Sequence, residues 1–286
     1  MSIACLFPGQ GSQSKGMGGE LFDRFPDWTA EADAILGYSI RELCVDDRGG
    51  ELGLTQFTQP ALFVVNAMTY RARQESSSPA PDFVAGHSLG EYNALVAAAV
   101  MDFATGLRLV RERGALMGRV RGGGMAAVVG MEPAAIQALL ESSDAGRRLD
   151  VANFNSFDQT VIAGPKEDLE AVKPAFETAG VRAYIILNVS APFHSRYMKD
   201  AMTEFAATLD GVAFAAPAIP VVANATARPY DAHAVRETLG RQIGNSVRWL
   251  DSMLFLMDAG VETFEELGPG SVLRKLAAQI KKKRAG

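Results

Sequence analysis

Hydrophobic residues follow two alternating patterns through the first 120 positions. Short apolar runs have the length of buried strands and occupy residues 3–7 and 83–85. Longer stretches repeat apolar residues at the spacing of an amphipathic helix. They cover residues 59–73, where Pro60 suits a first turn, and residues 90–120, with an expected break near Met101. This part of the chain therefore predicts strands and helices in alternation.

A run of three glycines, residues 122–124, marks a flexible joint at which the pattern changes. Beyond it the predicted elements follow the order strand, helix, strand, strand, helix, strand, which is the order of a ferredoxin-like fold. They cover residues 125–129, 133–140, 149–153, 159–163, 166–179 and 183–187. Two later apolar runs, residues 219–223 and 262–267, predict further strands of the first sheet.

These elements predict two domains of an α/β protein. A chain of 286 residues is long enough for one large domain or two modest ones. We expect a small ferredoxin-like (βαββαβ) domain at residues 123–189. It would be inserted into a large α/β-hydrolase-like catalytic domain made of residues 1–122 and 190–286.

Composition and charge narrow the class of protein. Hydrophobic residues make up 48% of the chain and charged residues 21%, as in soluble globular proteins. With a net charge of −5, the protein lacks the positive field that attracts nucleic acid. No run reaches the roughly 18 apolar residues of a membrane span, and the N-terminus has no targeting pattern, so we expect the mature protein to begin near Met1.

Cysteine and histidine usage argues against a metal site. Cys5 and Cys44 are too few for a disulfide framework, and no His cluster or CxxC pair accompanies them. We therefore expect no bound metal and a reducing, cytoplasmic location.

The candidate chemistry begins at Ser88, which lies between two glycines in GHSLG, residues 86–90. In a strand–turn–helix context, GxSxG is the pattern of a nucleophile elbow, in which a sharp turn presents the hydroxyl. Serine and glycine also fill ordinary turns, so the motif alone leaves both interpretations open. Because serine is a weak nucleophile at its free pKa, catalysis would also need a base.

Only three histidines could supply that base. His87 is adjacent to Ser88, and neighbouring side chains at an elbow point apart, so we expect a packing role. His233 lies in a polar segment that predicts a solvated helix start. His194 follows the last strand of the small unit, where the chain returns to the large one, and a domain junction suits a cleft residue. A buried structural histidine remains the alternative.

Eight motifs spread over nearly the whole chain carry a family resemblance. They are FPGQGSQ (7–13), TQPAL (58–62), GHSLGEY (86–92), LVRERGALM (109–117), GGMAAVVG (123–130), NFNSFDQTVIAG (153–164), FHS (193–195) and ELGPG (266–270). Together they resemble the malonyl-CoA:acyl carrier protein transacylases and the acyltransferase domains of polyketide synthases. APFHSRYM, residues 191–198, is similar to the discrete acyltransferases that serve polyketide synthases in trans.

The resemblance implies a catalytic role for four groups. Ser88 matches the family's nucleophile and His194 its general base. The backbone N–H groups of Gln10 and Leu89 are expected to form the oxyanion hole. The glycine loop around Gln10 lacks the lysine of a P-loop, which argues against nucleotide binding.

In the family a backbone carbonyl, and not an aspartate, orients the histidine. The matching segment here is NSVRW, residues 245–249, so the resemblance implies that the carbonyl of Arg248 has this role. Ser246 stands where the family pattern usually has proline, and we expect this loop to be less rigid for that reason.

Arg113 matches the family's substrate arginine, whose planar fork can hold the carboxylate of a malonyl group. From the residues alone, an exposed helix face shared with Arg111 and Glu112 is the alternative. Phe193 is expected to narrow the pocket near the acyl α-carbon and to favour malonyl over methylmalonyl. Further residues expected to line the cleft are Gln59, Met117 and Asn155.

The resemblance implies an enzyme that moves a malonyl group from malonyl-CoA to the phosphopantetheine thiol of an acyl carrier protein, by a ping-pong reaction through an acyl-serine. Malonyl-CoA is the donor, no bound cofactor or metal is expected, and polyketide biosynthesis is the expected pathway. Two enzymatic alternatives stay open: an editing acyl hydrolase that acts on carrier proteins, and the transacylase of fatty acid synthesis. A docking subunit without activity is disfavoured because Ser88 and His194 are both present.

The expected partner is the acyl carrier protein, with no nucleic acid and no membrane, and we expect a monomer. Because carrier proteins are typically acidic, basic residues near the cleft would guide them. The candidates are Arg228, Arg241 and the tail lysines Lys281, Lys282 and Lys283.

Overall fold

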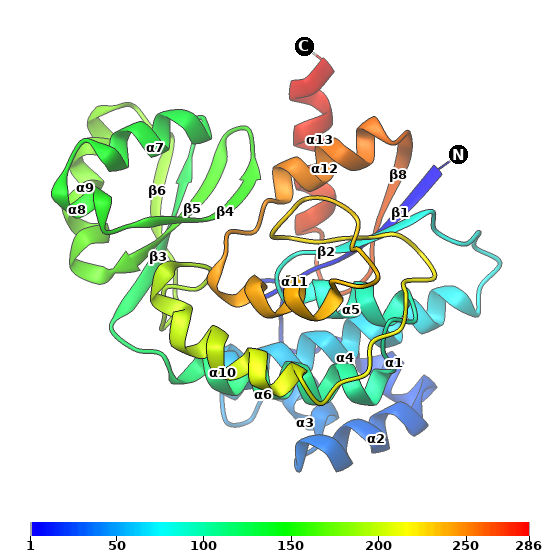
Figure 1. Cartoon of the computed structure of the whole chain (residues 1–286). Coiled ribbons are helices and arrows are strands. Elements are labelled where there is room, and N and C mark those ends of the chain that lie inside the picture. The colour runs from blue at the N-terminus through cyan, green and yellow to red at the C-terminus, as the bar shows by residue number, and fades with distance from the viewer. Residues whose placement is uncertain (1, 286) are drawn as a thin grey trace.

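Two separate four-stranded sheets organise the computed structural model, which describes residues 2–285 and leaves Met1 and Gly286 outside (Figure 1). The first, here called the large sheet, has the order β7-β2-β1-β8, and all its pairings are parallel. Its strands are β1 (Ser2–Phe7), β2 (Phe83–Gly86), β7 (Val221–Val222) and β8 (Val261–Glu266). All four strands occur where the sequence predicts them.

The second, here called the small sheet, is antiparallel and has the order β4-β5-β3-β6. Its strands are β3 (Gly123–Val129), β4 (Asp150–Ser156), β5 (Gln159–Pro165) and β6 (Ala183–Ile186). Its helices are α7 (Pro133–Glu141), α8 (Asp144–Arg147) and α9 (Lys166–Thr178). The predicted βαββαβ order is confirmed, with the short α8 as an addition. The protein is thus a mixed α/β structure with one parallel and one antiparallel sheet.

The inner strands β1 and β2 of the large sheet are mostly apolar because helices cover both of its faces, whereas the edge strand β8 carries three glutamates. Alternate residues of β1 point to opposite faces, so Cys5 and Phe7 join one buried cluster, and Ala4 and Leu6 join another. The first cluster includes residues of α4 (Thr55–Gln74), α5 (Gly90–Ala97) and α6 (Phe103–Arg119). The second includes residues of α12 (Trp249–Asp258) and α13 (Val272–Ala285).

Helix α4 begins earlier than the sequence predicts. α4 begins at Thr55, four positions before residue 59, so Pro60 lies inside the helix and not in its first turn. Proline has no N–H to donate to the Gln56 carbonyl four residues earlier, so α4 lacks one backbone hydrogen bond in its first turn. The predicted break near Met101 is confirmed, since Asp102 caps α6 by accepting a hydrogen bond from the Thr105 amide at 2.7 Å.

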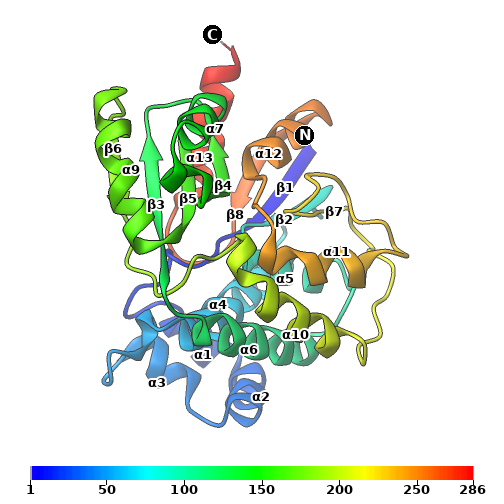
Figure 2. The same cartoon turned by 60° about the vertical axis from the view of Figure 1, so that its left-hand side comes forward.

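Several short helices complete the large-sheet half. They are α1 (Gly19–Arg24), α2 (Pro26–Leu36), α3 (Ile40–Val45), α10 (Lys199–Leu209) and α11 (Val235–Arg241), with 3₁₀ turns η1 (Glu51–Gly53), η2 (Arg196–Met198) and η3 (Gln242–Gly244). Figure 2 shows the small sheet standing over α4 and α6, joined to the rest by the green segment into β3 and the yellow-green segment after β6.

Within residues 2–285, no helix combines the length and the apolar composition that crossing a membrane requires.

Candidate active site

Ser88 sits in a tight turn between β2 and α5, with a backbone φ of 50° in the left-handed region. The turn depends on the glycines on either side of it. A Cβ atom at Gly86 would lie 1.9 Å from the carbonyl carbon of Gly90, and one at Gly90 would lie 2.0 Å from the Phe7 carbonyl oxygen. Only glycine fits at both positions, so the GxSxG pattern has a steric cause.

His194 faces Ser88 across the space between the two sheets. Its Nε2 atom lies 2.7 Å from the Ser88 hydroxyl, although 106 residues separate the two in sequence. Its Nδ1 atom lies 3.0 Å from the Gln242 carbonyl and 3.1 Å from the Asn245 carbonyl. Because carbonyl oxygens only accept, Nδ1 carries the ring proton, and Nε2 is left free to accept the serine proton.

The surroundings of His194 keep it neutral. Its side chain is buried, and burial lowers its pKa to about 3, with a further lowering from the positive charge of Arg113. At neutral pH the imidazole is therefore unprotonated at Nε2, which is the state that a general base requires.

The expectation for Arg248 is wrong. Its carbonyl accepts hydrogen bonds from the amide and the hydroxyl of Ser252, both at 2.9 Å, because Arg248 precedes α12 and its carbonyl points into the first turn of that helix. Ser246 also departs from expectation, since its hydroxyl donates to the Val151 carbonyl at 2.6 Å. This hydrogen bond fastens the loop to β4, and a proline could not make it.

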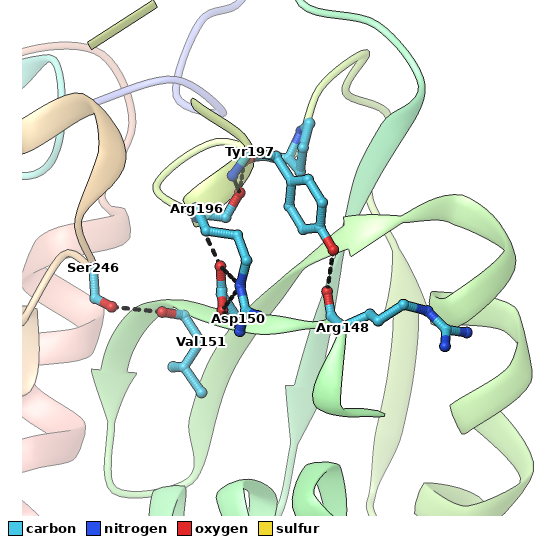
Figure 3. A network of polar contacts seen from close by, with 8 residues as sticks. Arg148, Asp150, Val151, Arg196, Tyr197 and Ser246 are labelled. Atoms are coloured by element: carbon cyan, nitrogen blue, oxygen red, sulfur yellow. Dashed lines mark hydrogen bonds and ion pairs between the residues drawn. The ribbon is translucent and has the colours of Figure 1, made fainter. Parts of the chain in front are cut away.

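Three polar contacts hold the region around β4 against the two segments that position His194 (Figure 3). Asp150 pairs with Arg196, whose Nε lies 2.8 Å from a carboxylate oxygen. Tyr197 donates its hydroxyl to the Arg148 carbonyl at 2.7 Å, and Ser246 contacts β4 as described. The segment after His194 and the segment carrying its carbonyl partners are thus both tied to the small sheet.

Arg113 is fully buried on α6, so the alternative of an exposed helix face is wrong. Its guanidinium donates to the Ser88 hydroxyl at 3.0 Å, to Gln59 Oε1 at 2.6 Å and to Gln242 Oε1 at 2.9 Å. All three partners are neutral, and its Nε atom has no hydrogen-bond partner. Burial lowers the pKa of Arg113, and among residues 2–285 no carboxylate lies within ion-pair distance of it.

Three further residues of the predicted pocket lie near Arg113 or His194. Gln59, which contacts Arg113, also donates to the sulfur of Met117 at 3.4 Å, and both side chains are buried. Phe193 is buried directly before His194. These positions agree with a cleft lining, and their contact with an acyl group stays a prediction.

Asn155 does not contact Arg113. Its side chain contacts His87 Nε2 at 2.9 Å, and the His87 ring packs against Trp249 with ring centroids 5.5 Å apart. Burial lowers the pKa of His87, which fits the packing role expected for it. His233 is exposed just before α11, as expected for a solvated helix start.

The two expected oxyanion donors lie in adjoining loops. Phe7 pairs with Gly86, so the loops after β1 and β2 leave the sheet side by side. At Gly9 an added Cβ atom would lie 2.4 Å from the His87 carbonyl oxygen and 3.7 Å from the Leu89 amide nitrogen. Within the described part of the chain, neither the Gln10 amide nor the Leu89 amide donates to a protein acceptor, so both stay available to a ligand.

Sequence reasoning missed the residue that connects these groups. The Gln242 side chain accepts from Arg113 and donates to the Ser88 carbonyl at 2.7 Å, while its own carbonyl faces His194. It also donates to Glu91 at 2.8 Å. Through its side chain and its backbone carbonyl together, Gln242 thus contacts Arg113, Glu91, the Ser88 backbone and His194. No local pattern marks it, because its contacts span more than 100 residues of sequence for Arg113 and Ser88.

Two other missed residues hold the turn at Ser88. Asn224 accepts from the Ser88 amide at 2.7 Å and donates to the Gly86 carbonyl at 2.6 Å. Glu91, in the GHSLGEY motif, accepts from the Asn224 amide at 3.2 Å and from the hydroxyl of Tyr230. Burial raises the pKa of Glu91 to about 7. The motif could have indicated Glu91, whereas nothing in the sequence indicates Asn224.

Among residues 2–285, no group of three or more His, Cys, Asp or Glu side chains is arranged to hold a metal ion. Both cysteines are buried and unpaired, and burial raises the pKa of each to about 12.

Comparison with known proteins gives the same family as the motifs. A family model for the acyl transferase domain matches residues 5–285. The polyketide biosynthesis malonyl CoA-acyl carrier protein transacylase BaeC of Bacillus velezensis is 50% identical over 280 residues, which are 98% of this chain and 96% of BaeC. The polyketide biosynthesis protein ThaF of Burkholderia thailandensis is 50% identical over 99% of this chain, and the chain spans 24% of its length.

Solved structures with a similar fold are members of the same family. A crystal structure of malonyl CoA-acyl carrier protein transacylase from Burkholderia pseudomallei has a TM-score of 0.95 at 50% identity, with 99% of both chains covered. A malonyl-transacylase in complex with a type II PKS acyl-carrier protein has a TM-score of 0.94 at 39% identity, covering 99% of this chain and 94% of that one. The chain therefore belongs to the malonyl CoA-acyl carrier protein transacylase family of acyl transferases.

Proposed function

We propose that this protein transfers a malonyl group from CoA to the phosphopantetheine thiol of an acyl carrier protein through an acyl-Ser88 intermediate. The observation that carries the proposal is Arg113, a buried cation without a carboxylate partner, 3.0 Å from a hydroxyl that also contacts His194. A malonyl thioester supplies the missing carboxylate and places its other carbonyl beside that hydroxyl.

In the first half-reaction, Ser88 Oγ attacks the thioester carbonyl while His194 Nε2 takes its proton. The Gln10 and Leu89 amides stabilise the negative oxygen of the tetrahedral intermediate. The intermediate breaks its carbon–sulfur bond, and CoA leaves as a thiol with the proton from His194. The carrier thiol then gives its proton to His194 and attacks the carbonyl of the acyl-serine. The carbon–oxygen bond to Ser88 breaks, and His194 returns the proton to Ser88 Oγ.

The acceptor is proposed to be a carrier protein of polyketide biosynthesis. Support comes from the 50% identity to BaeC and from the related malonyl-transacylase solved with a type II PKS acyl-carrier protein. Phe193 limits the α-carbon side of the pocket and so favours malonyl over methylmalonyl, a preference of one methyl group worth about 1 to 3 kcal/mol.

Residues 1–122 and 190–286 are proposed as an α/β-hydrolase-like catalytic domain and residues 123–189 as a ferredoxin-like small domain. Their separate sheets support this division, as does an apolar cluster, including Ile136 and Phe176, that lies wholly within the small segment. The protein would act as a monomer in the cytoplasm.

The test is the mass of the intact protein after incubation with malonyl-CoA. The wild-type chain should gain one malonyl group, and Ser88→Ala should gain none. Persistent labelling of the variant would remove Ser88 from the mechanism. When holo-carrier protein is added to the same incubation, release of free malonate without formation of malonyl-carrier would mean that the protein hydrolyses the acyl group and does not transfer it.

A further inference from the structure

Glu91 is a buried carboxylate that the proposed reaction steps do not use. It lies in the first turn of α5, shortly after Ser88, and its side chain is fully buried. Within residues 2–285 it forms no ion pair with a lysine, an arginine or a histidine. Removing a carboxylate from water without a cation is unfavourable, and burial raises the pKa of Glu91 to about 7. Groups with such shifted pKa values are frequent at functional sites.

Three donors converge on this carboxylate. Its Oε2 atom accepts from the side-chain amide of Gln242 at 2.8 Å and from the backbone amide of Asn224 at 3.2 Å. Its Oε1 atom accepts from the hydroxyl of Tyr230. All three donors belong to the stretch from the end of β7 to the start of η3, which is far from α5 in sequence. Because two of them share one oxygen, Glu91 joins Asn224 to Gln242.

The two residues that Glu91 joins hold opposite sides of Ser88. Asn224 Oδ1 accepts from the Ser88 amide at 2.7 Å, and Gln242 Nε2 donates to the Ser88 carbonyl at 2.7 Å. Ser88 has a φ of 50°, in the left-handed region that residues with a side chain rarely adopt. Such a conformation persists where the surrounding structure fixes it. The contacts through Glu91 stabilise it from both sides.

Glu91 also determines which way the Gln242 side chain faces. An amide has one accepting end and one donating end, and a rotation by 180° exchanges them. An ionised carboxylate and a carbonyl only accept, so the NH2 end of Gln242 faces Glu91 and Ser88, and its oxygen faces Arg113 at 2.9 Å. The backbone carbonyl of Gln242 accepts from His194 Nδ1 at 3.0 Å. One carboxylate therefore acts on both members of the Ser88–His194 pair through one neighbour.

We propose that Glu91 is a positioning residue for acylation: its carboxylate oxygen holds Asn224 and Gln242 in place, and these keep the Ser88 hydroxyl aligned with His194. None of the side-chain hydrogen bonds of Glu91 within residues 2–285 goes to Ser88 Oγ or to His194, so it acts only through its neighbours. The role requires an acceptor at Oε2 and does not require a negative charge. The proposal deepens the proposed function and rests on it, since it concerns the same nucleophile.

Two substitutions separate the acceptor from the rest of the side chain. In Glu91→Gln, the new amide oxygen accepts from Gln242 and Asn224, and the new NH2 group donates to the Tyr230 oxygen. In Glu91→Leu the side chain has a similar size, but all three donors lose their acceptor. KM and kcat are measured for both variants with malonyl-CoA and holo-carrier protein, and kcat is expressed per folded molecule.

Glu91→Leu should lower kcat roughly 30- to 100-fold, because a small misplacement of reacting groups has an effect of this size. KM for malonyl-CoA should stay within about twofold of wild type, since Arg113 keeps its contact with Gln59 at 2.6 Å. Glu91→Gln should restore kcat to within about threefold of wild type, because it restores the acceptor. A role in stability alone would give neither this separation of kcat from KM nor this rescue.

Asn93→Leu is the matched control for Glu91→Leu. Asn93 is buried on the same helix, donates to the Phe63 carbonyl at 2.9 Å and accepts from Asn66 at 3.1 Å, and neither contact belongs to the site. Its replacement should lower the unfolding midpoint about as much as Glu91→Leu does and leave kcat per folded molecule unchanged.

A milder pair of variants keeps the test decisive if Glu91→Leu does not fold. Tyr230→Phe removes the hydroxyl that fixes Oε1 of Glu91, and it should lower kcat severalfold with KM unchanged. Tyr184→Phe removes a hydroxyl that donates to the Leu169 carbonyl at 2.7 Å within the small-sheet half, and it should leave kcat unchanged.

Three results would overturn the proposal. They are a loss in Glu91→Gln equal to that in Glu91→Leu, an unchanged kcat in Glu91→Leu or in Tyr230→Phe, and an equal fall of kcat in a variant and its control. Phenylmethanesulfonyl fluoride, which reacts with activated serines and has no carboxylate, gives a second measurement. Its rate of reaction with Ser88 should fall in Glu91→Leu in parallel with kcat.

Failure of this proposal and failure of the proposed function give different results. If the wild-type protein gains no malonyl group from malonyl-CoA, the proposed function fails. If it gains the group and Glu91→Leu is acylated at the wild-type rate, only the role of Glu91 is wrong.

Discussion

At the scale of single residues, the site lacks a negative charge beside the buried guanidinium of Arg113. A buried cation is unfavourable unless a negative charge or enough hydrogen-bond acceptors compensate for its lost hydration. In the free protein Gln59, Gln242 and the Ser88 hydroxyl provide neutral acceptors only. A bound carboxylate would supply the charge and would release the serine hydroxyl from Arg113 to His194. Substrate binding would in this way prepare the nucleophile.

Replacing Arg113 by alanine should lower kcat/KM for malonyl-CoA by roughly 100- to 1,000-fold, which corresponds to the loss of about 3 to 4 kcal/mol from a buried charge pair. Transfer of acetyl from acetyl-CoA should improve relative to malonyl, because an uncharged acyl group no longer leaves a buried cation unpaired. Steady-state kinetics with both donors measure this. Equal losses for the two donors would mean that Arg113 supports the fold of the site and does not bind the carboxylate.

The pKa of His194 predicts the pH dependence of acylation. Burial and Arg113 lower it to about 3, so the imidazole stays unprotonated as pH falls through about 6.5, where an exposed histidine would gain a proton. The profile of kcat/KM for malonyl-CoA should therefore show no acid limb near pH 6.5. In Arg113→Met the nearest positive charge is gone, the pKa of His194 rises, and an acid limb should move toward neutral pH. A wild-type midpoint near 6.5 would contradict this.

At the scale of elements, His194 depends on two short segments and not on a long helix or a central strand. Its carbonyl partners belong to η3 and to the residue after it, and the Val247 amide donates to the Ala152 carbonyl at 2.8 Å. The Phe154 amide donates back to the Val247 carbonyl at 2.9 Å. These hydrogen bonds make the loop an extension of β4. The small sheet therefore takes part in setting the orientation of His194.

Ser246→Ala tests this coupling, because it removes one hydrogen bond between the loop and β4. We expect kcat to fall severalfold with KM for malonyl-CoA unchanged, since the substrate contacts stay in place while His194 loses part of its support. Ser252→Ala is the control: it also removes one hydroxyl hydrogen bond, here within the first turn of α12. Both variants should lose about 1 kcal/mol of unfolding free energy. An equal fall of kcat in both would contradict the coupling.

Elements with a local cause could be predicted from the sequence, and others could not. The turn at Ser88 was predictable because Gly86 and Gly90 are required by contacts within a few residues of it and with β1. The βαββαβ order followed from the lengths and periods of successive apolar segments. α1 and α3 have six residues each, too few for a helical period to emerge, and neither was predicted.

At the scale of the whole molecule, the parts of the site that sequence reasoning missed are those made by long-range contacts. Gln242 reaches the Ser88 carbonyl across 154 positions, and Asn224 reaches the Ser88 amide across 136. The error at Arg248 has a different, local origin, because a helix begins directly after it and the Ser252 amide and hydroxyl occupy its carbonyl. Arg113 shows the reverse case: its local pattern suggested an exposed face, whereas the structure buries it completely, and the substrate role that the family match implies stays a prediction.

The net charge of the whole chain, −5, opposes the approach of an acidic carrier protein at long range. Docking must then rely on a local positive field. Among the basic residues expected from the sequence to guide the carrier, Arg241 pairs with Glu237 and Lys283 pairs with Glu132. Neutralised side chains contribute little to such a field. Arg121 and Lys166 are exposed, form no ion pair within residues 2–285, and line with Gln10 a cavity whose lining has no Asp or Glu, so they are better placed to attract the carrier.

Salt should therefore weaken the carrier reaction selectively. Raising ionic strength from about 0.1 M to about 1 M shortens the Debye length from ~10 Å to ~3 Å, so kcat/KM for the holo-carrier should fall by roughly tenfold. Acylation by malonyl-pantetheine, which has no phosphate and no protein surface, should change little. In Arg121→Gln/Lys166→Gln the loss of rate with salt should disappear or reverse, because the attractive charges are absent and salt then screens only the repulsion between two acidic proteins. A carrier rate that is the same at both salt concentrations would mean that apolar contacts, and not these cations, bring the carrier to the active site.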